Sequence, residues 1–158
     1  MSKRIADYAA LLAFLAVTFA VAFAGSAVTL PNIAAWYGGL HKPSFSPPNF
    51  VFGPVWTVLY LMMAVAAWRV WRKTGLISRP MGLYVVQLGL NLAWSFLFFG
   101  GHFLGVALAE LVCLWLAVLA TLLAFRRHDP VAGWLFVPYL AWVSFAGALN
   151  AAVWHLNS

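Results

Sequence analysis

The stretch FLGVALAELVCLWLAVLATLLAF, residues 103–125, decides the fold class of this chain. It contains one charged side chain, that of Glu110, and two arginines, Arg126 and Arg127, follow it directly. A helix needs about 20 consecutive apolar residues to cross a hydrocarbon core of roughly 30 Å. The stretch therefore predicts a helix that spans a lipid bilayer.

Four further apolar stretches occupy most of the remaining chain, at about residues 8–29, 51–71, 81–100 and 132–154. Only 8% of the residues are Asp, Glu, Lys or Arg and 65% are apolar, whereas a soluble domain carries about 25% charged residues. The runs are continuous rather than alternating, which favours helices over barrel strands. The sequence predicts an all-α integral membrane protein in which residues 1–158 form a single domain, a bundle of five transmembrane helices.

The basic residues lie almost entirely on one side of this predicted bundle. That side, formed by the N-terminus and by the second and fourth links, carries Lys3, Arg4, Arg69, Arg72, Lys73, Arg79, Arg126 and Arg127, and the other side carries only Lys42. Because Lys and Arg accumulate in cytoplasmic loops, we expect a cytoplasmic N-terminus, an external C-terminus and a bacterial cell membrane. The net charge of +6 then reflects topology, and we expect no nucleic-acid partner.

The only long connection is predicted at residues 30–49, between the first two spans. Four prolines and a Gly-Gly pair argue against a long helix there; they are Pro31, Pro43, Pro47, Pro48 and Gly38-Gly39. The segment and its flank also carry the aromatic residues Trp36, Tyr37, Phe45 and Phe50. Two interpretations remain open: the segment folds onto the bundle as a lid, or its aromatic rings form a belt at the membrane surface.

The third span carries polar residues on one face, since Gln87, Asn91 and Ser95 follow one another at intervals of four. Polar groups are costly in hydrocarbon unless they are paired, so we expect this face and the nearby Trp94 to point into the bundle. The fifth span adds Trp142 and Asn150. Two interpretations remain open. These side chains line a pocket for a flat apolar ligand, or they only form hydrogen bonds between helices.

Small residues recur at every fourth position of the fourth span, at Gly101, Gly105, Ala109, Cys113, Ala117 and Thr121. A shorter pair, Gly89 and Ala93, occurs in the third span. Such patterns allow two helix backbones to approach closely. The partner is either a neighbouring helix of the same bundle or a second subunit.

The residues that usually carry catalysis or bind metals are scarce. The four histidines, His41, His102, His128 and His155, all lie at the ends of spans, so we expect no metal site. Nucleotide-binding and nucleophile motifs are absent. Glu110 is the only acid well inside a span, which makes it either a functional candidate or a hydrogen-bond partner of a nearby loop.

Four blocks of sequence resemble one family of membrane proteins. They are WYGGLHKPSFSPP at residues 36–48, FGPVWTVLY at 52–60, QLGLNLAWSFLFFG at 87–100 and PYLAWVSFAGALN at 138–150. In this order and spacing they resemble the tryptophan-rich sensory protein or translocator protein family, once called the peripheral benzodiazepine receptor family.

The resemblance implies a ligand cavity beneath the first loop of a five-helix bundle. Its members bind, without a covalent link, tetrapyrroles such as protoporphyrin IX and haem, and also benzodiazepine-type drugs. A role in tetrapyrrole sensing, regulation or transport follows from the resemblance. The ligand-binding residues that it implies are Trp36, Tyr37, Pro47, Trp56, Asn91, Trp94, Trp142 and Ala146.

The resemblance also carries alternatives and further partners. Some relatives are thought to degrade porphyrins in light, with Trp36 and Trp142 as the candidate catalytic residues, and others act in lipid or sterol transport. Members form homodimers, often through the third helix. The proposed cholesterol motif needs Lys or Arg shortly after a tyrosine in the fifth span, but no Lys or Arg follows Tyr139, so we do not expect tight cholesterol binding through this segment.

Overall fold

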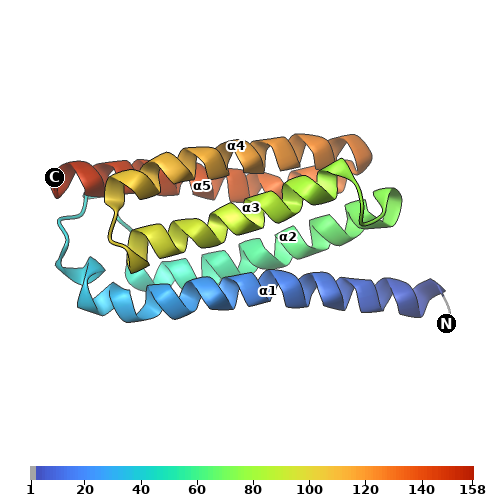
Figure 1. Ribbon diagram of the computed structural model, residues 1–158, viewed down its shortest axis with the longest axis horizontal. Helices are drawn as coiled ribbons and strands as arrows, with labels where there is room; N and C mark the ends of the chain where they lie inside the picture. The colour runs from blue at the N-terminus through green and yellow to red at the C-terminus, as the bar shows by residue number, and fades with distance from the viewer. Residues whose placement is uncertain (1–2) are drawn as a thin grey trace.

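A computed structural model describes residues 3–158 as a bundle of helices (Figure 1). The long helices are α1 (Lys3–Ala35), α2 (Phe52–Thr74), α3 (Arg79–Ser95), α4 (Leu104–His128) and α5 (Pro130–Leu156). Short 3-10 helices lie at Tyr37–Gly39 and Asn49–Val51, and a π-helical turn at Phe96–Gly100 extends α3. Five helical segments are long and apolar enough to cross a membrane. The predicted all-α five-span architecture is confirmed.

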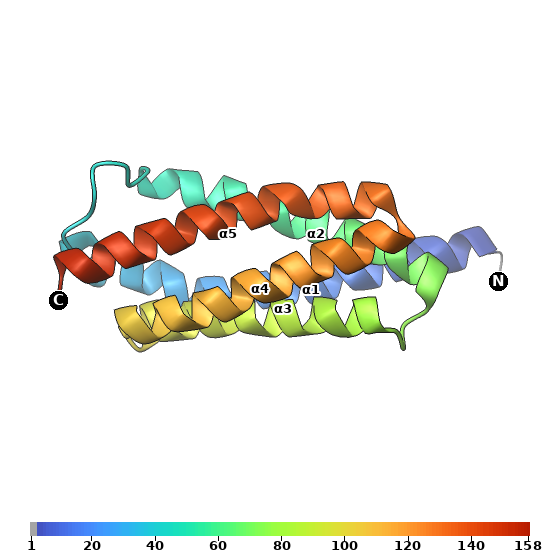
Figure 2. The ribbon, with the colours of Figure 1, turned by 90° about the horizontal axis from the view of Figure 1, so that it is seen from above.

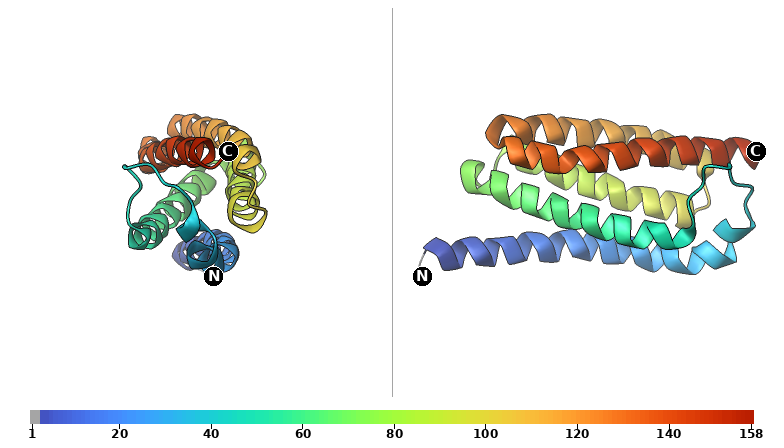
Figure 3. Two further views of the ribbon diagram at one scale, coloured as in Figure 1. Left: turned by 90° about the vertical axis from the view of Figure 1, so that its left-hand side faces the viewer. Right: turned by 180° about the vertical axis from the view of Figure 1, so that it is seen from behind.

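The helices lie along one axis and form a ring in the order α1, α2, α5, α4, α3, with the closest packing between α4 and α5 (Figures 1 and 3). One end of the bundle carries residues 36–51, here called the first loop, together with the α3–α4 turn and the C-terminus (Figure 2). We call it the loop end. The opposite end, the basic end, carries the helix ends that contain Arg69, Arg72, Lys73, Arg79, Arg126 and Arg127.

The predicted start of the first connection at residue 30 is wrong, because α1 continues through Pro31 to Ala35. A single proline removes one backbone donor, and transmembrane helices tolerate that loss. The helix continues for another turn, in which the Asn32 side chain donates to the Val28 carbonyl at 2.9 Å. The prolines that prevent helix formation are the later ones, between Pro43 and Pro48.

The last turn of the third span is a π-helix rather than an α-helix. The backbone N–H of Gly101 donates to the Phe96 carbonyl at 2.7 Å, which is the wider spacing of a π turn. The turn brings two consecutive side chains, Phe98 and Phe99, into the interior, with 3% and 9% of their surface exposed. Two adjacent residues of an ordinary α-helix point about 100° apart, so this wider turn supplies extra aromatic surface at the loop end.

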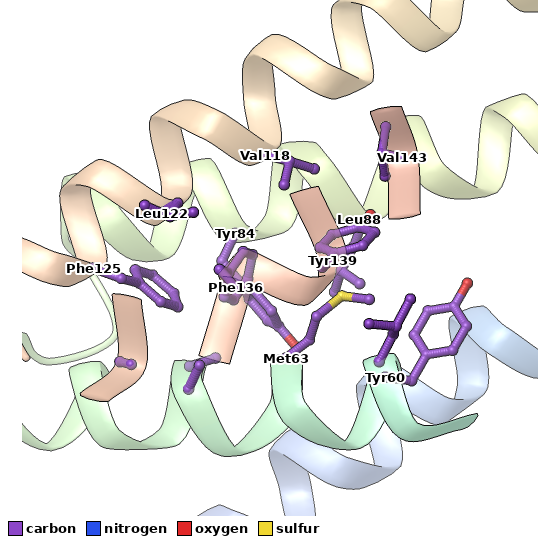
Figure 4. Packing of buried hydrophobic residues seen from close by; sticks show 14 of the residues in the cluster. Tyr60, Met63, Tyr84, Leu88, Val118, Leu122, Phe125, Phe136, Tyr139 and Val143 are labelled. Carbon is purple, nitrogen blue, oxygen red and sulfur yellow. The ribbon is translucent and has the colours of Figure 1, made fainter. Parts of the chain in front are cut away.

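The basic half and the middle of the bundle are filled with packed side chains. Figure 4 shows this core, in which Phe136 of α5 contacts the rings of Phe125 and Tyr139 in edge-on arrangements at 5.1 and 5.8 Å. Met63 of α2 and Val118 of α4 have no exposed surface. The core therefore leaves no continuous passage along the axis through the basic half.

Asp129 joins α2, α4 and α5 at the basic end. Its carboxylate accepts from the Ala132 N–H at 3.1 Å and thereby caps α5. It also pairs with Arg69 at 3.0 Å and with Lys73 at 3.2 Å, and only 2% of Asp129 is exposed. Burial by itself would raise the pKa of Asp129, but these hydrogen bonds and the Arg69 charge hold the pKa below its ordinary value.

We expect the folded protein to lose stability in acid through this residue. The pKa of Asp129 is lower in the folded than in the unfolded chain, so its contribution is present above about pH 4 and is lost as the pH falls through the folded-state pKa. Thermal unfolding in detergent between pH 3 and 7 measures the effect. Asp129→Asn keeps a capping side chain but loses the charge, so its melting temperature is expected to be lower at pH 7 and to fall less in acid.

Candidate functional site

A cavity of about 770 Å³ occupies the loop half of the bundle. Its walls come from α1, α2, α3 with its π turn, and α5, whereas no described residue of α4 lines it. Most lining side chains are apolar or aromatic, and the aromatic ones are Phe19, Phe23, Tyr37, Phe50, Phe52, Trp56, Tyr60, Trp94, Phe98, Phe99 and Trp142. A volume of about 300–1,000 Å³ with a few polar groups is typical of a small-molecule site.

The structure brings most of the sequence-predicted ligand residues to this one cavity. Those that line it are Tyr37, Trp56, Asn91, Trp94, Trp142 and Ala146. Trp36 and Pro47 belong to the first loop and do not line it. Residues from four separate segments therefore converge as the pocket interpretation requires.

Three tryptophans from three helices form the walls, and neighbouring rings support each one. Trp94 stacks on Phe98 with ring centroids 5.0 Å apart. Trp142 meets Phe52 edge-on at 5.9 Å. Trp56 lies 5.5 Å from the ring of Tyr60. Such contacts fix the orientation of an indole before a ligand arrives.

A hydrogen-bonded chain forms the floor of the cavity, toward the middle of the bundle. The Tyr60 hydroxyl donates to Oδ1 of Asn91 at 2.6 Å, and Nδ2 of Asn91 donates to the Tyr139 hydroxyl at 2.9 Å. The Tyr139 hydroxyl in turn donates to Oε1 of Gln87 at 2.9 Å. The predicted inward polar face of the third span is thus present: Gln87 and Asn91 hydrogen-bond between helices, and Asn91 also lines the pocket.

The indole of Trp94 is held by a second chain. Its Nε1 donates to Oδ1 of Asn150 at 3.2 Å, and Nδ2 of Asn150 donates to the Leu104 carbonyl at 2.9 Å. Asn150 is 1% exposed, so this chain joins α3, α4 and α5 in a water-excluded place. Further polar side chains, Ser26, Thr29 and Asn49, line the cavity nearer the loop end. The cavity therefore has an apolar middle and a more polar edge.

The first loop covers the loop end of the cavity. His41 and Asn157 exchange two hydrogen bonds, from the His41 N–H at 3.0 Å and to the His41 carbonyl at 2.9 Å. Tyr37 folds inward against Phe98 and Phe99 and is 5% exposed. Phe45 and Phe50 remain more than half exposed. The loop therefore covers this end of the bundle and still presents two aromatic rings to its surroundings.

Trp36 supports the first loop from outside the cavity. Its indole stacks on the His102 ring with centroids 4.0 Å apart, and Nε2 of His102 donates to Oδ1 of Asn32 at 3.2 Å. The contact connects the end of α1 to the α3–α4 turn. The structure thus places Trp142 in the cavity wall but Trp36 against the turn.

Lys42 also lies in the first loop, with its ammonium 4.8 Å from the centroid of the Tyr37 ring. Burial raises the pKa of the Tyr37 phenol above its ordinary value, so this group is neutral at physiological pH. Tyr37 therefore separates the Lys42 charge from the cavity interior.

Sequence reasoning missed the wall that α1 provides and the two phenylalanines of the π turn. The first span is mostly apolar, but Ser26 and Thr29 lie three residues apart on its cavity side, so their spacing could have indicated that face. Phe98 and Phe99 are consecutive buried residues of the π turn, which the sequence alone did not indicate. Tyr60 follows Trp56 by four residues, so helical periodicity could have identified it.

Glu110 takes no part in this site. Both of its carboxylate oxygens are shielded from solvent and have no hydrogen-bond partner among residues 3–158. Within the same range, no group of three or more His, Cys, Asp or Glu side chains could hold a metal ion. The cavity lining contains no histidine, cysteine or methionine, so aromatic surface is what the site offers to a guest.

Comparison with known proteins agrees with this architecture. The model of the TspO/MBR family matches residues 14–155. The chain is 39% identical to the tryptophan-rich protein TspO of Archaeoglobus fulgidus, over 94% of this chain and 97% of the relative. It is 42% identical to the human translocator protein, over 85% and 82% of the two chains. It is also 42% identical to the tryptophan-rich sensory protein of Cereibacter sphaeroides, over 96% and 93%.

A family match over most of the chain and several relatives near 40% identity lead to one conclusion. The sequence blocks that carried the resemblance are the segments that line the cavity or cover it. This integral membrane protein belongs to the TspO/MBR family.

Proposed function

We propose that the protein binds a planar tetrapyrrole, such as protoporphyrin IX or haem, in the cavity under the first loop and acts in tetrapyrrole sensing or regulation. Benzodiazepine-type drugs are expected to compete for the same place. One observation carries the proposal: an apolar cavity of about 770 Å³ has Trp56, Trp94 and Trp142 in its walls, each from a different helix.

The expected affinity follows from ring stacking. A planar base that stacks on an aromatic side chain contributes about 1–3 kcal/mol, and a porphyrin ring offers comparable surface. Three such contacts supply about 3–9 kcal/mol in total, and a micromolar Kd corresponds to about 8 kcal/mol. Because the tryptophans are already held by Phe98, Phe52 and Tyr60, little conformational entropy is lost when the guest binds.

The polar groups of the cavity favour one orientation of the guest. The floor amide of Asn91 hydrogen-bonds to Tyr60 and Tyr139, so it is poorly placed to receive a charged carboxylate. Ser26 and Asn49 lie nearer the loop end, and Lys42 lies beyond Tyr37 on the same side. We therefore propose that the ring system enters the apolar middle and that the carboxylates stay at the loop end.

The packing supports binding rather than passage through the bundle. Side chains with no exposed surface, among them Met63 and Phe136, fill the basic half below the Tyr60–Asn91–Tyr139 floor. A through-path would require this core to open. Light-dependent degradation involving Trp36 and Trp142 receives less support, since Trp36 is stacked on His102 outside the cavity lining.

The setting of the protein is also a proposal. Of the Lys and Arg residues whose side chains the structure describes, all but Lys42 lie at the basic end, which supports a cytoplasmic N-terminus in a bacterial cell membrane. Homodimerisation through α3 is supported by Gly89, because an added side chain there would meet no atom within 4 Å. On α4, Gly105 packs against Trp154 of the same chain, so that end of the small-residue pattern serves the bundle.

Filling the cavity is expected to abolish binding. Ala146→Phe adds a ring to the α5 wall of the cavity, one helical turn from Trp142, and we expect protoporphyrin IX affinity to fall by more than about tenfold because the planar guest no longer fits. Quenching of tryptophan fluorescence in detergent micelles measures the Kd. Ala148→Phe, at an exposed position of the same helix, is the matched control and should bind as the parent does. Equal affinities for the two variants would refute the assignment of the ligand to this cavity.

A further inference from the structure

The cavity has a lateral opening between α1 and α2. Several residues line the cavity and are also exposed on the outside of the bundle. On α1 they include Phe23, Ser26 and Leu30, and on the facing side Phe50, Gly53 and Thr57. Phe23 is 77% exposed and Phe50 is 79% exposed. Because both helices span the bilayer, the outside at this level is acyl chain rather than water.

The opening is confined to the loop half, because α1 and α2 are held together toward the basic end. The Trp68 indole donates to the Asp7 carbonyl at 2.9 Å, and Phe14 packs against Trp71 with ring centroids 6.0 Å apart. Nearer the middle, Phe19 lies 6.3 Å from the Tyr60 ring. These contacts close the basic half of the α1–α2 interface. Its other half carries the exposed cavity residues.

The water-facing end of the cavity is covered more firmly than its side. The His41–Asn157 pair of hydrogen bonds attaches the first loop to α5, and the Trp36–His102 stack attaches it to the α3–α4 turn. Access from water would require these contacts to break. Access from the bilayer meets mobile lipid, exposed side chains and Gly53, where an added side chain would contact nothing within 4 Å.

We propose that the guest reaches the cavity sideways, from the bilayer leaflet at the loop end, through a portal bordered by Phe23, Ser26, Leu30, Phe50, Gly53 and Thr57. The inference rests on the proposed function for the identity of the guest, a planar apolar ring that partitions into membranes. The apolar ring slides between α1 and α2 while its carboxylates remain at the membrane surface. The first loop stays in place throughout.

The first test is kinetic and uses protoporphyrin IX supplied from phosphatidylcholine vesicles. Gly53→Phe narrows the portal, and we expect association and dissociation to slow together by at least roughly tenfold. Gly82→Phe is the control, since Gly82 is also an exposed helical glycine with no atom within 4 Å of an added Cβ, and both rates should match the parent. Unchanged rates, or faster dissociation, in Gly53→Phe would overturn the proposal.

The second test holds the first loop closed. In a Cys113→Ser background, cysteines introduced at His41 and Asn157 are joined with a short bismaleimide. The portal predicts an association rate within about twofold of the unlinked protein. A tenfold slower rate after crosslinking would show that the guest passes under the loop.

The third test needs no porphyrin, so it separates failure of the portal from failure of the proposed function. A phosphatidylcholine with a diazirine near the end of its acyl chain is photolysed around the ligand-free protein in vesicles. The portal predicts labelling of Trp56, inside the cavity, in the parent and its loss in Gly53→Phe but not in Gly82→Phe. Labelling confined to outward-facing residues in the parent would contradict the portal, whatever the porphyrin titrations show.

Discussion

Replacement of Trp142 by alanine is expected to weaken protoporphyrin IX binding by about 5- to 150-fold. This range corresponds to the loss of one stacking contact of about 1–3 kcal/mol. Trp142 lines the cavity from α5 and meets Phe52 edge-on, so its removal takes away one wall and frees a second ring. Trp94→Ala should have a similar effect, with an added loss because the Asn150 side chain then lacks its indole donor.

The control for Trp142 is Trp134→Ala, which removes an indole from the same helix at a position that is 65% exposed and distant from the lining. Its Kd should equal that of the parent. Trp142→Phe retains an aromatic face and should recover most of the lost affinity. The pocket assignment fails if Trp94→Ala and Trp142→Ala both titrate like the parent in the fluorescence assay.

The replacement Asn91→Leu is expected to destabilise the bundle by about 1–3 kcal/mol. It removes the acceptor of the Tyr60 hydroxyl and the donor to the Tyr139 hydroxyl, at positions that are 7% and 0% exposed. Measured interhelical hydrogen bonds in membrane proteins average about 0.6 kcal/mol and reach about 1.7. A buried polar group that loses its partner costs more, about 1–3 kcal/mol, because it is left without any hydrogen bond. Unfolding in mixed micelles with increasing dodecyl sulfate gives the free energy.

A second variant distinguishes lost hydrogen bonds from altered packing. Tyr60→Phe in the Asn91→Leu background removes the orphaned hydroxyl, so part of the lost stability should return, because replacing both partners by apolar groups is nearly neutral. If the double variant is less stable than Asn91→Leu alone, the packing of residue 60 rather than its hydrogen bond explains the effect.

The sequence predicted an integral membrane protein because each apolar segment contributes its own independent evidence for a membrane span. Each apolar run indicates a span by its length alone. The Lys and Arg clusters indicate where the cytoplasmic links lie, and this needs no information on contacts between helices. The inward face of α3 was equally accessible, since Gln87 and Asn91 lie one helical turn apart and hydrocarbon penalises unpaired amides. The predicted end of α1 before Pro31 was wrong, because the rule that proline ends a helix is weaker within a membrane span.

The complete set of residues that form the cavity walls was beyond the sequence. Trp36 and Tyr37 are neighbours in the chain, yet Tyr37 lines the cavity while Trp36 stacks on His102. The π turn that holds Phe98 and Phe99 is followed by the α3–α4 turn, in which His102 has a left-handed φ of 59°. On α1, Ser26 and Thr29 marked the cavity-facing side only weakly, because a single hydroxyl group can also hydrogen-bond to the backbone of its own helix.

By itself, the amino-acid sequence determined the number of spans, their charge asymmetry and the polar face of the third helix, since each follows from how single segments partition between water and hydrocarbon. Only the tertiary structure decided that a cavity exists, that packed side chains fill the basic half, and that some cavity residues of α1 and α2 are exposed on the outside of the bundle. These features depend on how side chains from different helices fill or fail to fill shared volume. The sequence of one segment taken alone does not determine how that volume is filled.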